Sequence, residues 1–114
     1  MDTLPIINKT YQLYKQIFDM DSRIEKRWRY SLGGSLEQTI LQLMGKLVMA
    51  KHAPKTIKAT YLLRAVANQE IAVLKLRLFL ELAVGQETKI SQSQTVLSEI
   101  GRMLGGWLKS LGAS

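Results

Sequence analysis

Cysteine is absent from this 114-residue chain, so neither a disulfide nor a thiolate metal site is available. The single histidine, His52, stands beside Lys51 near an expected helix end, where a solvated side chain suits the helix dipole. Zinc sites need three or four nitrogen or sulfur ligands, which this sequence does not supply. The acids are scattered and form no close pair for general acid–base chemistry. We therefore expect a protein that is not an enzyme and that holds no metal or cofactor.

Long apolar runs are also missing. The longest stretch without a charged residue has nine residues, from Ile90 to Ser98, against the roughly 20 apolar residues that a membrane-spanning helix needs. The N-terminus, MDTLPIINK, has an early acid and no apolar run, unlike a secretory signal. We expect a cytoplasmic protein without membrane contact. Apolar residues make up 46% of the chain, enough for one core and a single domain over residues 1–114.

Acidic residues are absent between Glu37 and Glu70, so positive charge is concentrated in the middle of the chain. Residues 23–64 hold nine lysines and arginines against two acids, so the net charge of +7 arises there. The rest of the chain has seven basic and seven acidic residues. A basic segment on a balanced scaffold indicates a polyanion or an acidic protein as the partner.

Helical periodicity is what the sequence does contain, and no stretch alternates in the manner of a strand. We expect four helices, at about residues 4–20, 22–52, 55–84 and 91–109. The connections between them are short, so helices that follow one another are expected to be antiparallel. The expected fold is therefore all-α, an up-down-up-down four-helix bundle.

Several of these helices carry end signals. Thr3 and Pro5 are typical of the start of the first helix, and Ser91-x-x-Gln94 is a capping box for the fourth. Inside the second helix, the pair Gly33–Gly34 interrupts the pattern and Ser35-x-x-Gln38 offers a fresh capping box. This segment is either one long helix or a basic loop followed by a shorter helix, and we favour one long helix.

Apolar spacing predicts the buried faces of two helices. In the first helix the predicted stripe is Ile7, Tyr11, Tyr14 and Phe18. In the third it is Leu62, Val66, Gln69, Val73, Leu76, Leu80 and Ala83. A second set widens the apolar sector of the third helix well beyond a third of its circumference: Ile71, Leu74, Leu78 and Leu82. A helix so apolar is central, or faces both its own core and a neighbouring subunit, which favours oligomerisation.

Two basic stretches are candidate contacts for nucleic acid or another partner. The first, RIEKRWRY, groups cations with Trp28 and Tyr30: Arg23, Lys26, Arg27 and Arg29. In one interpretation, the guanidinium groups beside these aromatics hold phosphates and stack on bases. In the other, Trp28 closes the bundle end while the cations are solvated. The two interpretations are compatible. The second stretch surrounds the turn between the second and third helices: Lys46, Lys51, Lys55, Lys58 and Arg64. It predicts a basic cap at one bundle end, whose phosphate contacts weaken steeply with salt.

Three glycines lie within the last helix, in EIGRMLGGWLKS (99–110). Each costs about 1 kcal/mol relative to alanine inside a helix. Either the helix ends at Gly105–Gly106 and Trp107 folds back, or it continues and lets a neighbouring helix approach closely at Gly101 and Gly105. We favour the second interpretation, which gives a packing role to Gly101, Gly105, Gly106 and Trp107.

Three segments together resemble a known family, the accessory variability determinant (Avd) proteins of diversity-generating retroelements. They are this ending, the preceding LKLRLFLELAVG (74–85) and RWRYSLGGSLEQTILQLM (27–44). That family belongs to a larger group of four-helix bundles that includes the 23S rRNA intervening-sequence proteins. The resemblance covers about residues 27–111, and GRMLGGW is its most specific part. It implies a non-catalytic protein that forms a basic, homopentameric ring and associates with the element's reverse transcriptase. Such a protein binds RNA or DNA and supports mutagenic copying of template RNA into cDNA.

Two other hypotheses stay open. A basic bundle of the 23S rRNA intervening-sequence type would serve an RNA or an acidic protein partner outside any retroelement. A chorismate-mutase-like bundle would bind a dicarboxylate through inward-facing Arg64, Lys75 and Arg77, although no acid–base partner accompanies them. The number five and the polymerase partner rest on the resemblance and not on composition or spacing.

Overall fold

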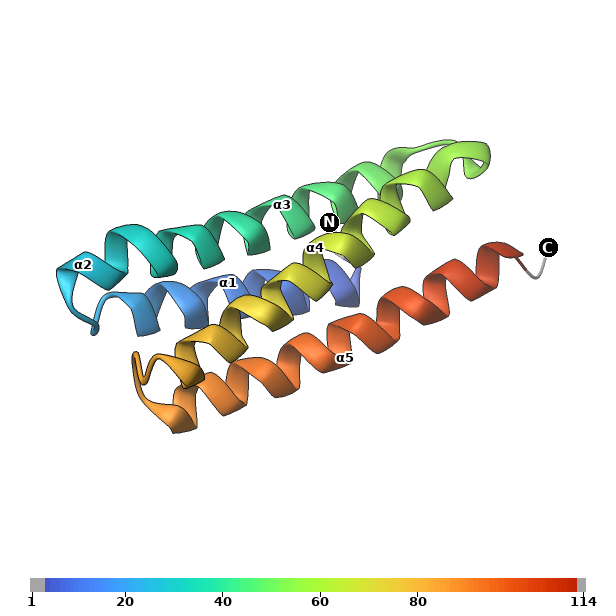
Figure 1. Cartoon of the computed structure of the whole chain (residues 1–114). Helices are drawn as coiled ribbons and strands as arrows, with labels where there is room; N and C mark the ends of the chain where they lie inside the picture. The colour runs from blue at the N-terminus through green and yellow to red at the C-terminus, as the bar shows by residue number, and fades with distance from the viewer. Residues whose placement is uncertain (1–3, 113–114) are drawn as a thin grey trace.

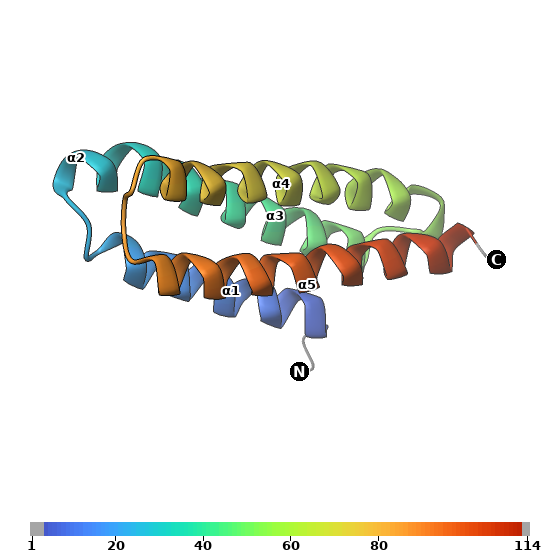
Figure 2. The same cartoon turned by 60° about the horizontal axis from the view of Figure 1, so that its bottom comes forward.

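A computed structural model describes residues 4–112 and shows that the chain is built from helices. In chain order these are α1 (Pro5–Asp21), α2 (Lys26–Trp28), the π-helical turn η1 (Arg29–Gly33), α3 (Gly34–His52), α4 (Lys55–Glu81) and α5 (Glu87–Gly112). The four long helices alternate in direction within a body of 47 × 25 × 20 Å (Figures 1 and 2). The described range contains no strand, so the predicted all-α fold with four helices is confirmed.

One core lies between the four long helices, since α1 and α4 each pack against both α3 and α5. Every one of these helices contributes fully buried side chains, among them Leu13, Leu43, Phe79 and Leu97. Burying a side chain of this size stabilises the fold by about 1.5–3 kcal/mol. The arrangement also decides which connections meet. The α1–α2 and α4–α5 connections lie at one end of the bundle, and the α3–α4 turn lies at the other (Figure 1).

α1 starts at Pro5 as predicted, and Thr3 lies outside the described residues. Its buried face agrees with the predicted stripe only in part: Ile7 is buried and Tyr14 is partly buried, whereas Tyr11 and Phe18 are 48% and 59% exposed. The other buried positions are Ile6, Thr10, Leu13, Ile17, Met20 and Asp21. The polar Thr10 fits among them because its hydroxyl donates to the Ile6 carbonyl at 2.8 Å.

The second predicted helix begins at Lys26 instead of residue 22 and then runs without a break to His52. Gly33–Gly34 does not interrupt it, because the backbone passes through the π-helical turn η1 directly into α3. A Cβ at Gly33 would lie 2.8 Å from the carboxyl carbon of Asp21, so only glycine fits this close approach. Ser35 lies inside the helix and does not cap it.

α5 begins at Glu87 instead of residue 91, so Ser91 lies inside the helix and does not cap it. The Ser91 carbonyl accepts the hydroxyl of Thr95 at 3.1 Å. The earlier start buries Ile90 in the core. It also places the Glu87 carboxylate at the positive end of the helix dipole, where a negative charge is stabilising.

α4 ends at Glu81, three residues before the predicted end at 84. The chain then turns through positive φ angles of 55° at Ala83 and 79° at Gly85. The amide of Val84 donates to the Phe79 carbonyl at 2.9 Å, and the Val84 side chain is buried. The turn therefore closes one end of the core before α5 begins.

α5 continues to Gly112 through its three glycines, so it does not end at Gly105–Gly106. A Cβ at Gly101 would lie 2.7 Å from the side-chain nitrogen of Gln69, which donates to the Leu97 carbonyl at 3.1 Å. Among residues 4–112, no atom beyond the chain neighbours and the surrounding helix backbone lies within 4 Å of the same position at Gly105 or Gly106. The close approach therefore occurs at Gly101, and a side chain of α4 makes it.

Replacing Gly101 with leucine is expected to lower the free energy of unfolding by about 1–3 kcal/mol, because the added side chain displaces Gln69. Gly105→Leu is the matched control, since the same change in the same helix meets open space and gains helix propensity. Urea unfolding followed by circular dichroism measures both. Equal stability of the two variants would contradict the role of the Gln69 contact.

Candidate nucleic-acid interface

The basic residues predicted as a binding site divide between the two ends of the bundle (Figure 1). We call the first group the α2 end: Arg23, Lys26, Arg27 and Arg29. We call the second group the turn end, because it surrounds the α3–α4 turn: Lys46, Lys51, Lys55, Lys58 and Arg64. The longest dimension of the bundle is 47 Å. The two groups are therefore separate surfaces, and they are considered in turn.

The turn end keeps its positive charges together. The acid-free residues 38–69 fold into the second half of α3 and the first half of α4, which pack side by side. Lys55 and Arg64 are exposed, while Lys46 and Lys51 are half-buried. Because no acidic residue belongs to this stretch, its surface attracts anions.

Lys58 has a structural task at the turn end. Its ammonium group donates to the carbonyls of Ala50 and Lys51 at 2.7 and 3.1 Å, in the last turn of α3. Carbonyls in that turn have no partner within the helix, and a cation there also offsets the helix dipole. Lys58 therefore caps α3, and the exposed cations of this end are Lys55 and Arg64.

Arg29 has a comparable structural role at the α2 end. Its guanidinium group donates to the carbonyls of Asp21, Ser22 and Ile24 at 3.2–3.3 Å. These bonds tie η1 to the end of α1 and hold the α1–α2 connection. The exposed cations that remain at the α2 end are Arg23, Lys26 and Arg27.

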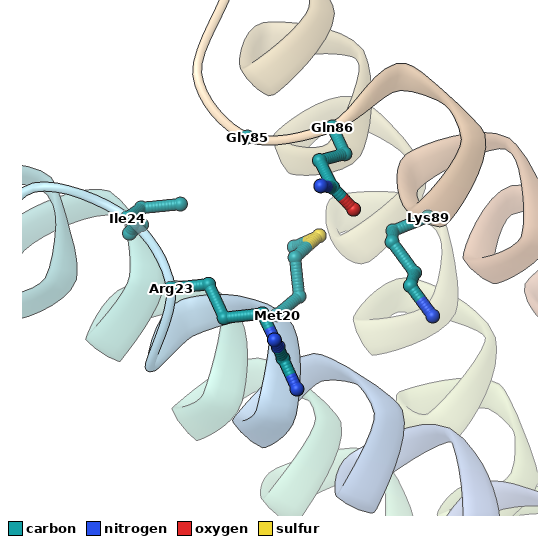
Figure 3. Close-up of a pocket in the computed structure, with 6 residues that line it drawn as sticks. All are labelled: Met20, Arg23, Ile24, Gly85, Gln86 and Lys89. Carbon is teal, nitrogen blue, oxygen red and sulfur yellow. The ribbon is translucent and has the colours of Figure 1, made fainter.

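A groove crosses the α2 end between the α1–α2 connection and the α4–α5 turn (Figure 3). It consists of two adjoining cavities of about 50 and 250 Å³, and Trp28 lines the larger one. The two cavities share Arg23, Ile24, Gly85 and Gln86. Lys89 lines the smaller cavity, and Figure 3 shows Arg23 and Lys89 extending toward the same side of the groove.

Lys89 and Gln86 are not among the residues that the sequence predicts for this site. They lie far from Arg23 along the chain, in a part whose charges balance, so composition does not single them out. The topology of the bundle does indicate that these residues lie near Arg23. In an up-down-up-down bundle, the connections after the first and third helices meet at the same end.

Trp28 both closes the bundle end and lines the groove. It is half-buried and packs against the core, and part of it borders the larger cavity. The guanidinium carbon of Arg27 lies 4.3 Å from the centroid of its ring, which is a cation–π contact. Both interpretations of Trp28 from the sequence are therefore compatible with its position.

Asp21 buries a carboxyl group beneath the α2 end. It is 1% exposed, and within residues 4–112 neither of its oxygens has a hydrogen-bond donor. Burial, and next the neighbouring Glu37 carboxylate, raises the pKa of Asp21 to about 8. This pKa favours the protonated form of Asp21 at pH 7.

α4 exposes a line of apolar side chains on the side opposite the core. We call it the outer α4 face, and its members are 39–60% exposed: Leu63, Ile71, Leu74, Leu78 and Leu82. Val73, which the sequence assigns to the buried face, is also exposed. The core positions of α4 are taken by Leu62, Ala65, Ala72, Leu76 and Phe79. A contiguous apolar strip of this kind is typical of a protein–protein interface.

The three basic residues of the chorismate-mutase-like hypothesis do not meet inside the bundle. Arg64 and Arg77 are exposed, and Arg77 lies 3.6 Å from the Glu81 carboxylate. The ammonium group of Lys75 donates to the Thr39 hydroxyl at 2.7 Å and joins α4 to α3. The inward-facing site that this hypothesis requires is therefore not formed by these side chains.

Within residues 4–112, no three histidine, aspartate or glutamate side chains gather as a metal site would need. In the same range, no helix has the length and apolar character to cross a membrane. No protein-family model and no curated protein sequence matches the chain.

Proposed function

We propose that this protein is a non-catalytic accessory protein of a diversity-generating retroelement, and that it binds nucleic acid and the element's reverse transcriptase. The observation that carries the binding proposal is the turn end, where exposed Lys55 and Arg64 lie in a stretch without acids. Contacts of lysine and arginine with phosphates dominate nucleic-acid affinity. The retroelement and the polymerase partner are drawn from the resemblance of the GRMLGGW ending.

The same proposal includes assembly into a homo-oligomeric ring of five subunits. Its physical support is the outer α4 face, because apolar side chains so exposed are stabilised when a second copy covers them. Five is the number that the family resemblance implies, and contacts between unlike faces of neighbouring copies close into rings. A ring repeats the turn end around its circumference. One strand can then contact several turn ends at once, which strengthens binding without any new kind of contact.

Charge reversal at the turn end tests the proposal. A variant with Lys46→Glu, Lys55→Glu and Arg64→Glu is expected to bind a fluorescent single-stranded RNA more weakly, with the slope of log affinity against log salt reduced by about two. Lys58 is left unchanged because it caps α3. Fluorescence anisotropy measures RNA binding, and co-purification measures capture of the reverse transcriptase.

The matched control carries the same change of charge elsewhere on the surface: Lys15→Glu, Arg77→Glu and Arg102→Glu. All three control positions are exposed, so the fold should tolerate them. The control is expected to keep most of its RNA affinity and its polymerase capture. If the turn-end variant retains both activities as well as the control does, the turn end is not the contact surface.

A further inference from the structure

The groove at the α2 end differs from the turn end in its chemistry. It places an aromatic ring, two cations and two further polar side chains around one opening: Trp28, Arg23, Lys89, Gln86 and Glu25. Its floor is apolar, formed by Met20, Ile24 and Val84, all of which are buried. A hollow that combines buried apolar side chains with a few convergent polar groups is typical of a ligand site. A purely electrostatic contact surface needs neither the aromatic ring nor the hollow.

We propose that this groove binds one unpaired nucleotide of a single-stranded nucleic acid, with the base against Trp28 and the phosphate at the cationic edge formed by Arg23 and Lys89. The inference rests on the proposed binding of nucleic acid and specifies what the α2 end recognises. The turn end contacts the backbone of any strand, whereas the groove takes a base that is not paired.

The base is expected to stack on the ring of Trp28, which lines the larger cavity. The guanidinium carbon of the exposed Arg27, which is not part of the cavity lining, lies 4.3 Å from the centroid of the same ring. Bases stack both on aromatic rings and on guanidinium planes, whatever their sequence. A base within a duplex has both faces covered by its neighbours, so it cannot use this platform without leaving the stack.

The phosphate is expected at the opposite side of the groove. Arg23 is paired with Asp19 at 3.4 Å, but both side chains are more than half exposed, so this ion pair is weak and can be exchanged for a phosphate. Lys89 extends toward the same side of the groove as Arg23 (Figure 3). Arg29 does not take part, because the carbonyls of the α1–α2 connection occupy its guanidinium group.

The edge of the base is expected to meet two polar side chains that differ in their hydrogen-bonding capacity. Gln86 offers a donor and an acceptor, and the Glu25 carboxylate accepts hydrogen bonds, for example from the exocyclic amino group of cytosine or adenine. Glu25 also repels phosphate. It therefore favours the orientation with the base at Trp28 and the phosphate at Lys89.

Tryptophan fluorescence tests the inference directly, because the chain has two tryptophans, Trp28 and Trp107. In a Trp107→Phe protein the remaining signal comes from Trp28, and in a Trp28→Leu protein it comes from Trp107. Both are titrated with a single-stranded RNA and with a duplex RNA of the same length. The single strand is expected to quench Trp28 and not Trp107, and the duplex is expected to leave Trp28 unquenched.

Affinity for the single strand gives a second readout. Trp28→Leu keeps an apolar side chain at the bundle end but removes the aromatic face, and it is expected to weaken binding of the single strand by about five- to 100-fold. Arg23→Gln with Lys89→Gln changes only exposed side chains and is expected to weaken the same binding several-fold. Duplex binding should change less in both variants. Circular dichroism checks that each variant is folded.

The outcomes separate this inference from the proposed function. If the single strand binds but leaves Trp28 unquenched, or if duplex and single strand quench it equally, the groove does not take an unpaired base and nucleic-acid binding still stands. If the Arg23 and Lys89 variant binds the single strand as well as wild type does, the cationic edge is also refuted. If neither RNA binds at low salt, the proposed function and the inference fall together.

Discussion

Changing Leu74 and Leu78 to glutamate is expected to convert an assembled protein into a folded monomer of 12.9 kDa. Both side chains belong to the outer α4 face and are 52% and 39% exposed, so the substitutions remove little from the bundle core. In an interface between copies, the same positions would bury glutamates without partners, at a cost of several kcal/mol. Size-exclusion chromatography with light scattering measures the mass of wild type and variant.

A control on α3 makes this experiment specific. Leu41→Glu with Val48→Glu replaces two apolar residues that are about equally exposed, at 44% and 41%, but lie outside the outer α4 face. This variant is expected to keep the wild-type mass. A wild-type protein that is itself a stable monomer would refute the ring, and a glutamate variant with unchanged mass would refute the outer α4 face as its interface.

Asp21→Asn is expected to stabilise the protein, and the gain should grow with pH. The pKa of Asp21 is raised from 3.8 to about 8 in the folded chain, so between these values the folded protein holds a proton that the unfolded chain has lost. The free energy of unfolding of wild type therefore falls as pH rises through this range, by at most about 1.4 kcal/mol for each pH unit. Asparagine removes the ionisation and keeps the size of the side chain.

Urea unfolding of wild type and Asp21→Asn at several pH values between 4 and 9 measures this effect. The two stability curves are expected to separate from pH 4 upward and to become parallel above about pH 8. Asp19→Asn is the control, because Asp19 is two residues away and its side chain is 54% exposed. It should change stability by less than about 1 kcal/mol. Curves that stay parallel for Asp21→Asn throughout would contradict a protonated Asp21.

The helices themselves can be predicted from the sequence, but the phase of α1 cannot. The spacing of Tyr11, Tyr14 and Phe18 fits a helical stripe as well as the spacing of Leu13 and Ile17 does. The structure decides between them because the aliphatic set fills the narrow space between α3 and α5, with Leu13 and Ile17 fully buried. The spacing of apolar residues along one helix does not reveal how much volume the neighbouring helices leave for its side chains.

Only part of the candidate site could be predicted, because some roles of its residues depend on contacts between helices. The positive charge of the turn end follows from sequence, because consecutive antiparallel helices keep neighbouring residues together. The tasks of Arg29 and Lys58 do not follow, since they depend on carbonyl groups left open at the ends of α1 and α3. The raised pKa of Asp21 does not follow either, since it depends on burial and on the nearby Glu37 of α3.

Binding of a labelled single-stranded RNA by the wild-type chain, measured by anisotropy between 50 and 200 mM salt, decides whether the protein binds nucleic acid. We expect clear binding at 50 mM salt and a loss of affinity of at least about tenfold at 200 mM, because several lysines and arginines release counterions from the phosphates. No binding at 50 mM salt would contradict the proposed binding. Such a result would favour a module whose positive charge serves an acidic protein partner.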